Sequence, residues 1–120
     1  MDGEPDPTEL FERIPFAEDL GIELTRAADG HAEGRLELAE RHTSNERTGV
    51  VHGGVTYSLA DTVGGAAAYS AVGRSTPTVA TVDVTVTDGS GAPVAECRGV
   101  YKTGGGDGGG AWGDRPGGSR

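Results

Sequence analysis

The chain has 120 residues, which fits one small domain, and a domain of this size buries a modest share of its surface, which favours self-association. Nineteen acidic residues against ten basic ones give a formal charge of -9, which repels nucleic acid and anionic membrane surfaces. A single cysteine, Cys97, excludes an internal disulfide, and the three histidines are too scattered for a zinc-binding spacing. We therefore expect no nucleic-acid partner, no metal and no cofactor.

The N-terminal residues predict a cytoplasmic protein, because they are acidic and lack the basic start and apolar run of a secretory signal. The long stretch poor in charge, residues 53–73, carries Asp61 at its middle and suits a buried helix better than a membrane span. No membrane partner is expected. The acidic balance, with nine arginines and one lysine, would suit a high-salt cytoplasm in which screening weakens self-repulsion.

The first predicted element is a short helix over residues 7–13. Asp6 can cap this helix, and Pro7 fits its first position. Pro15 disfavours its continuation, so Phe16 and Leu20 are expected to serve as apolar anchors ahead of an extended segment.

A β-hairpin is predicted next, because apolar and polar residues roughly alternate over residues 21–28 and 31–39. Asp29-Gly30 between them is typical of a two-residue hairpin turn. Residues 41–48 are polar without a period, which predicts an exposed loop. Loops that lead into a buried element often carry function, and Asn45 is the candidate functional residue in this one.

A long helix is predicted over residues 53–73, where apolar residues recur at helical spacing with little charge on any face. A helix this apolar must be covered by protein. Gly64 and Gly65 would weaken it locally, which indicates close packing against another backbone. Residues 78–87 alternate valine with polar residues and predict a strand, and residues 93–102 predict a second strand after a turn.

These elements divide the chain into a domain of residues 1–103 and a tail of residues 104–120. The tail is too rich in glycine and too poor in apolar surface to become ordered. Two strands, one long helix and two further strands predict an α+β domain in which an antiparallel sheet curls around the helix.

The start of the long helix carries residues suited to chemistry. After His52, the glycines Gly53 and Gly54 let a substrate approach closely, while the first N–H groups of the helix favour a partly negative oxygen. Asp61 lies about two turns further on and is the only charged side chain between His52 and Arg74. Such a helix would bury this carboxylate, which is costly unless it serves a purpose. Together these residues supply the oxyanion donor, the polariser and the base or nucleophile of acyl transfer.

Each of these features has a simpler interpretation when taken alone. Asp61 can be a polar residue at a wet subunit seam, or it can bond to Ser58 or Thr62. A lone His52 is more often structural, and a glycine pair is more often a plain helix entry. Only their combination within one element favours a catalytic interpretation.

The same residues resemble a family signature. The pattern resembles the signature of the phenylacetate-degradation branch of hotdog-fold acyl-CoA thioesterases, and it consists of Asn45, Gly49, His52-Gly53-Gly54 and Leu59-Ala60-Asp61. Residues 15–24, 76–84 and 91–102 resemble segments that flank this signature, so the likeness covers most of residues 10–103. It implies a hotdog fold, an acyl-CoA substrate and a homodimer or homotetramer whose active sites lie between subunits.

The resemblance also implies roles for five residues. Asp61 would attack the thioester carbonyl or activate water, and the Gly54 N–H would bind the developing oxyanion. His52 would orient the loop and the thioester, and Asn45 would position water or the carboxylate. Thr81 matches a position that often holds a Ser or Thr near the lytic water.

The chain departs from this family between Asp83 and Val84, where about thirty residues, or two strands with their turns, are missing from the expected pattern. We therefore expect a sheet narrower than usual for the family, with open edges prone to association and a weakened site for the CoA nucleotide.

The sequence leaves two functions open. The first is hydrolysis of acyl-CoA thioesters, and the alternative is a catalytically impaired relic that binds acyl-CoA or serves as an interaction module. A dehydratase or hydratase of the same fold fits the spacing poorly.

Overall fold

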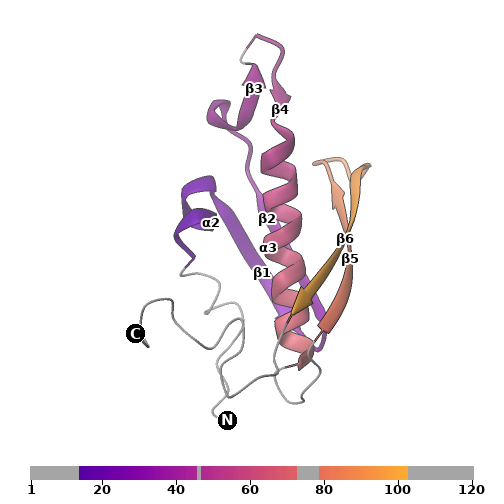
Figure 1. Cartoon of the computed structure of the whole chain (residues 1–120). Coiled ribbons are helices and arrows are strands. Elements are labelled where there is room, and N and C mark those ends of the chain that lie inside the picture. The colour runs from indigo at the N-terminus through magenta and orange to yellow at the C-terminus, as the bar shows by residue number, and fades with distance from the viewer. Residues whose placement is uncertain (1–13, 46, 73–78, 103–120) are drawn as a thin grey trace.

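The computed structural model describes residues 14–45, 47–72 and 79–102. Its centre is one long helix, α3 (Gly53–Val72), which confirms the helix predicted there. A hairpin of β1 (Ile22–Ala28) and β2 (His31–Leu36) packs on one side of α3, and a hairpin of β5 (Val79–Thr87) and β6 (Pro93–Lys102) packs on the other (Figure 1). The predicted helix over residues 7–13 and the predicted tail over residues 104–120 lie outside the described residues.

A short helix that the sequence pattern does not predict, α2 (Pro15–Leu20), precedes the first strand. Pro15 lies at its start, where the missing N–H of proline costs nothing and its fixed φ favours the helix. Gly21 ends the helix at a φ of 88°, a left-handed conformation that glycine adopts freely. Pro15 therefore begins a helix of its own.

The first hairpin forms as predicted around its two-residue turn. Asp29 and Gly30 both have positive φ, 55° and 86°, which matches the right-handed twist of the flanking strands. The pairing runs antiparallel from Ala28 opposite His31 to Ile22 opposite Leu36, so β2 ends three residues earlier than expected.

The inner side of this hairpin packs against α3. Leu24 and Ala27 of β1 form the core together with Val63 and Ala66 of the helix. Gly34 lets β2 approach the helix closely, since a Cβ placed there would lie 2.8 Å from the Cγ2 atom of Val63.

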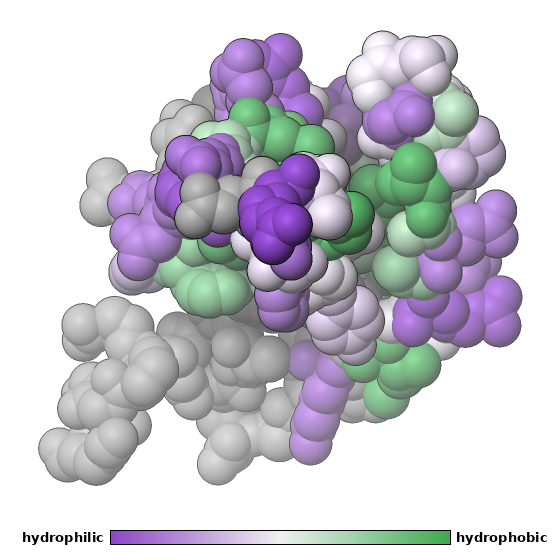
Figure 2. Space-filling model, turned by 90° about the horizontal axis from the view of Figure 1, so that it is seen from above, coloured by the Kyte–Doolittle hydropathy of each residue, from purple (hydrophilic) through white to green (hydrophobic). Residues whose placement is uncertain are grey.

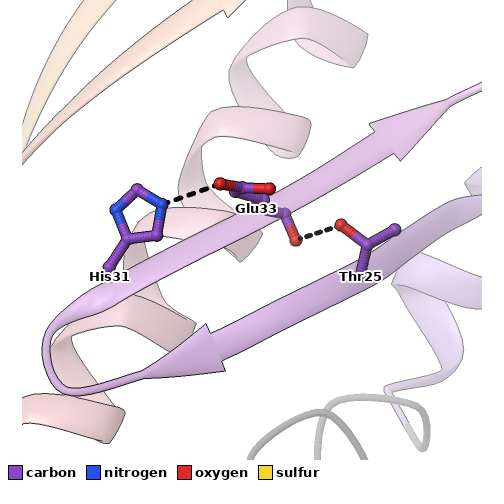
Figure 3. Close-up of polar contacts among 3 residues, drawn as sticks. All are labelled: Thr25, His31 and Glu33. Atoms are coloured by element: carbon purple, nitrogen blue, oxygen red, sulfur yellow. Dashed lines mark hydrogen bonds and ion pairs between the residues drawn. The ribbon is translucent and has the colours of Figure 1, made fainter.

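The outer side of the hairpin carries polar pairs (Figure 3). Glu33 Oε2 lies 2.9 Å from His31 Nε2, and the Thr25 hydroxyl donates to the carbonyl oxygen of Glu33 over 3.1 Å. The hydrogen bond from His31 lowers the pKa of Glu33. The Thr25 contact ties β1 to β2, and neither contact takes part in the core.

The predicted exposed loop over residues 41–48 is partly wrong. It contains the end of a 3₁₀ turn, η1 (Glu40–His42), and the strand β3 (Thr43–Asn45). β3 pairs with β4 (Val50–Val51) in a small hairpin that lies beyond the start of α3 (Figure 1).

His42, inside this segment, is only 1% exposed. Its Nδ1 accepts from the Ala39 N–H over 2.9 Å, so its Nε2 donates to the Leu20 carbonyl oxygen over 2.7 Å. Because the His42 backbone carbonyl also accepts the N–H of His52, this buried residue ties the end of α2 to the entry of α3.

The second hairpin pairs residue by residue from Val79 opposite Lys102 to Val86 opposite Ala95, as the alternating pattern predicts. Among the described residues the strands pair only as three separate hairpins, not as one continuous sheet. The facing edges of β2 and β5 border a cavity of about 600 Å³ whose floor is formed by Leu59, Val63 and Ala67 of α3. Antiparallel strands around one helix are thus confirmed, whereas the predicted loss of a segment between Asp83 and Val84 stays a prediction.

Candidate functional site

The first half of α3 carries a stripe that the described part of the chain leaves uncovered. Gly53, Gly54, Tyr57 and Asp61 recur every three or four residues and are all exposed, with Tyr57 70% exposed. In the second half of the helix, residues 63–68 are all buried. The expectation that protein covers the whole helix is therefore wrong for this stripe.

The surface around the start of α3 is chemically mixed. Seen from this end of the molecule, hydrophobic patches lie between polar ones (Figure 2). Several large apolar side chains of the described chain are more than half exposed, among them those of Phe16, Leu38, Val50 and Tyr57.

Asp61 is exposed, so the prediction of a buried carboxylate is wrong for the single chain. The physical reason is that the large hairpins cover α3 mainly around residues 63–68 and leave the side chain of Asp61 largely open. Among the described residues, Asp61 still contacts Tyr101. The Tyr101 hydroxyl lies 3.3 Å from Oδ1 of Asp61 and 3.1 Å from the backbone carbonyl oxygen of Asp61.

Tyr101 is the residue of this site that sequence reasoning missed. It lies on β6, and its ring extends across two glycines, Gly99 of its own strand and Gly64 of α3. Burial, reinforced by the charge of Asp61, raises the pKa of Tyr101 to about 12. The hydroxyl consequently keeps its proton at neutral pH and can donate to the carboxylate.

At the start of α3, the structure brings His52 and Gly54 together as predicted. The Gly54 N–H donates to Nδ1 of His52 over 2.8 Å, and the Val55 N–H donates to the His52 carbonyl oxygen over 2.9 Å. His52 therefore caps the helix. The Gly54 N–H, expected to be free for an oxyanion, is occupied by this imidazole.

Gly54 and Asp61 share the open stripe but do not meet within one chain. Seven residues of α-helix separate them by about 10 Å along the axis, nearly two full turns. An oxyanion donor acts at about 3 Å, so one oxygen atom cannot contact both groups at once.

The other two predicted site residues lie apart from Asp61. The side-chain oxygen of Asn45 accepts the Arg47 N–H over 2.9 Å, so this amide closes its own loop at the end of β3. Thr81 is exposed on β5 opposite Val100, on the face that points away from α3. Its neighbours Ala80 and Val82 occupy the inner face.

Comparison with known proteins gives one family match and one similar solved structure. A family model described as the thioesterase superfamily matches residues 48–95, a segment that contains His52, Gly54, Asp61 and Thr81. The solved structure of the conserved protein PA5202 from Pseudomonas aeruginosa is similar, with a TM-score of 0.50 and 28% sequence identity over 75% of this chain and 67% of that chain. A comparison with curated proteins finds no match.

These findings identify the fold as the hotdog fold, an α+β arrangement of antiparallel strands around one main helix. The family match supports hydrolysis of a thioester as the general class of reaction. Within the described ranges, no helix combines the length and the apolar character needed to cross a membrane.

Proposed function

We propose that this chain hydrolyses acyl-CoA thioesters to a carboxylic acid and free CoA. The observation that carries the proposal is the position of Asp61. It is the only charged side chain of α3, and it lies on the same open stripe as Gly54, inside the segment that matches the thioesterase superfamily. A carboxylate and a helix-terminal N–H are the base or nucleophile and the oxyanion donor that thioester hydrolysis requires.

In the proposed reaction, Asp61 either attacks the acyl carbon or removes a proton from the water that attacks it. The carbonyl oxygen becomes negative and is stabilised by the Gly54 N–H. The C–S bond then breaks, CoA leaves as its thiolate and takes up a proton, and the acyl group ends as a carboxylic acid. When Asp61 is the attacking group, water afterwards hydrolyses the acyl-aspartate anhydride.

His52 has a defined part in this sequence. Its Nδ1 holds the Gly54 N–H over 2.8 Å in the free chain, so the thioester oxygen takes that donor from the imidazole when substrate binds. The displaced ring is then free to orient the thioester at the helix start, which is the role expected for His52.

The complete site needs a second copy of the chain, because Gly54 and Asp61 of one α3 lie about 10 Å apart. Two copies related by a two-fold axis, with their α3 helices antiparallel, would set Gly54 of each chain against Asp61 of the other. This packing would also cover the exposed Tyr57, which lies between these two residues on the stripe. We therefore propose a homodimer, or a tetramer built from such dimers, with two equivalent sites per pair.

The test is a thiol-release assay of the wild type and Asp61→Asn over a panel of acyl-CoAs. Loss of the carboxylate should lower kcat by about a hundredfold or more. Asp19→Asn, a matched change at an exposed aspartate of α2, should keep the wild-type rate. Equal rates for wild type and Asp61→Asn would refute the role of Asp61. Calorimetric binding of CoA without turnover would instead indicate an acyl-CoA-binding module.

A further inference from the structure

We infer that Tyr101 is a positioning residue that holds the Asp61 carboxylate in one orientation on the open stripe of α3. The inference rests on the proposed function, since it assigns a task to a residue that touches Asp61 rather than the substrate. It adds β6 to a site whose predicted residues lie on α3 and the segments next to it.

The contact between the two residues is specific. The Tyr101 hydroxyl lies 3.3 Å from Oδ1 and 3.1 Å from the carbonyl oxygen of Asp61. A phenol has one proton to donate, and both of these acceptors belong to the same residue. An ionised carboxylate is the stronger acceptor of the two, so the O–H is expected to favour Oδ1. The other carboxylate oxygen, Oδ2, is then left for water or the thioester.

Two glycines, Gly64 and Gly99, leave the space that the side chain of Tyr101 occupies. A Cβ atom at Gly64 would lie 2.5 Å from the Tyr101 hydroxyl, and a Cβ atom at Gly99 would lie 2.7 Å from its Cε2 atom. A side chain at either position would force the ring of Tyr101 to shift. A glycine inside a helix costs about 1 kcal/mol relative to alanine, so Gly64 has a cost that close approach of the hydroxyl explains.

The groups around the Tyr101 hydroxyl favour its protonated form, which can donate a hydrogen bond. Asp61 and Tyr57 face it from α3, and Cys97 faces it from β6. Burial and these groups raise the pKa of Tyr101, so its proton stays in place across the pH range in which a carboxylate can act as a base. An exposed aspartate would otherwise move among several rotamers, and one fixed donor removes that freedom.

Tyr101→Phe tests the inference, because phenylalanine keeps the ring over both glycines and removes only the O–H. We expect kcat to fall about tenfold, in line with the loss of one hydrogen bond to a charged group, with little change in KM. A wild-type kcat in Tyr101→Phe would overturn the inference.

A double-mutant cycle separates positioning from a general structural effect. In an Asp61→Asn background, Tyr101→Phe should produce almost no further loss, because the carboxylate that it positions is gone. A full tenfold loss in that background would show that Tyr101 acts elsewhere. Gly64→Ala should also lower kcat in the wild-type background, since the added methyl group would lie 2.5 Å from the Tyr101 hydroxyl and displace it.

A measurement without turnover keeps the inference testable if the proposed function fails. Three-bond NMR couplings from the backbone to the Asp61 carboxyl carbon report its χ1 rotamer. One rotamer is expected in the wild type and an average of several in Tyr101→Phe. Averaged couplings in both proteins would refute the positioning role. Fixed couplings in a wild type that hydrolyses no thioester would refute only the proposed reaction.

Discussion

The two faces of α3 differ in what covers them. On one face, Val63 and Ala66 pack against β1 inside the core, and Ala66 is 0% exposed. On the other, Tyr57 and Asp61 lie open in the single chain. The covered face joins the helix to its own hairpins, while the open face carries the charge and the aromatic group that a substrate or a second chain can use. Stability and function are therefore expected to respond separately to changes on the two faces.

The largest expected effect comes from placing a charge on each face in turn. Ala66→Asp buries an unpaired carboxylate and should cost about 3–5 kcal/mol, a large part of the stability of a small domain. Tyr57→Asp exposes the same new group to solvent and should cost the fold of the chain less than about 1 kcal/mol. Urea unfolding followed by circular dichroism measures both.

The second of these variants also tests association. Tyr57→Asp should abolish the proposed dimer in sedimentation velocity, and thioester hydrolysis with it, because a charge would be buried where two α3 helices are proposed to meet. A Tyr57→Asp protein that still dimerises and hydrolyses thioesters would mean that the open stripe is not the subunit contact.

A smaller effect is expected from one added methyl group at two glycines. Gly34→Ala pushes a Cβ to 2.8 Å from Val63 and 3.0 Å from the Glu23 carbonyl oxygen, so it should cost about 1–3 kcal/mol. Gly53→Ala, at the open start of α3, meets nothing within 4 Å and should cost nothing. The difference in Tm between the variants measures how tightly the covered face is packed, and equal Tm values would contradict the close approach of β2.

Local patterns predicted the elements well where the signal lies within a few residues. The Asp29-Gly30 turn fixed the first hairpin, and adjacency alone placed His52 beside Gly54. Burial depends on distant partners, and there the pattern failed. His42 belongs to a polar run, yet it is buried because it bonds to Leu20, 22 residues earlier.

The same limit applies to the candidate site. The apolar composition of α3 predicted that Asp61 would be buried, but composition does not say which face a hairpin covers. Tyr101 approaches Asp61 across 40 residues of sequence. The sequence near Tyr101 offers one signal, Gly99 two positions earlier on the same face of the strand, and α3 offers another, Gly64. These glycines indicate close packing, but they do not identify Asp61 as the contact.

The smallest expected effect lies away from both faces of α3, on the outer side of the second hairpin. Arg98 Nε donates to Asp83 Oδ1 over 2.7 Å, and this hydrogen bond lowers the pKa of Asp83. A carboxylate whose pKa is lowered by folding stabilises the fold at neutral pH, and that contribution disappears as the pH falls through the folded-state value. Both side chains are about 70% exposed, so solvent screens the pair strongly.

Asp83→Asn should therefore lower Tm slightly at pH 7, and the difference from wild type should shrink in 1 M salt. It should also vanish at a pH below both the folded and the unfolded pKa of the carboxyl, because the wild-type side chain is then neutral as well. Thermal melts at the two pH values, with and without salt, measure these differences. A loss as large as that of Gly34→Ala would mean that the second hairpin depends on its outer surface, and that the packed face of α3 is not the main source of stability.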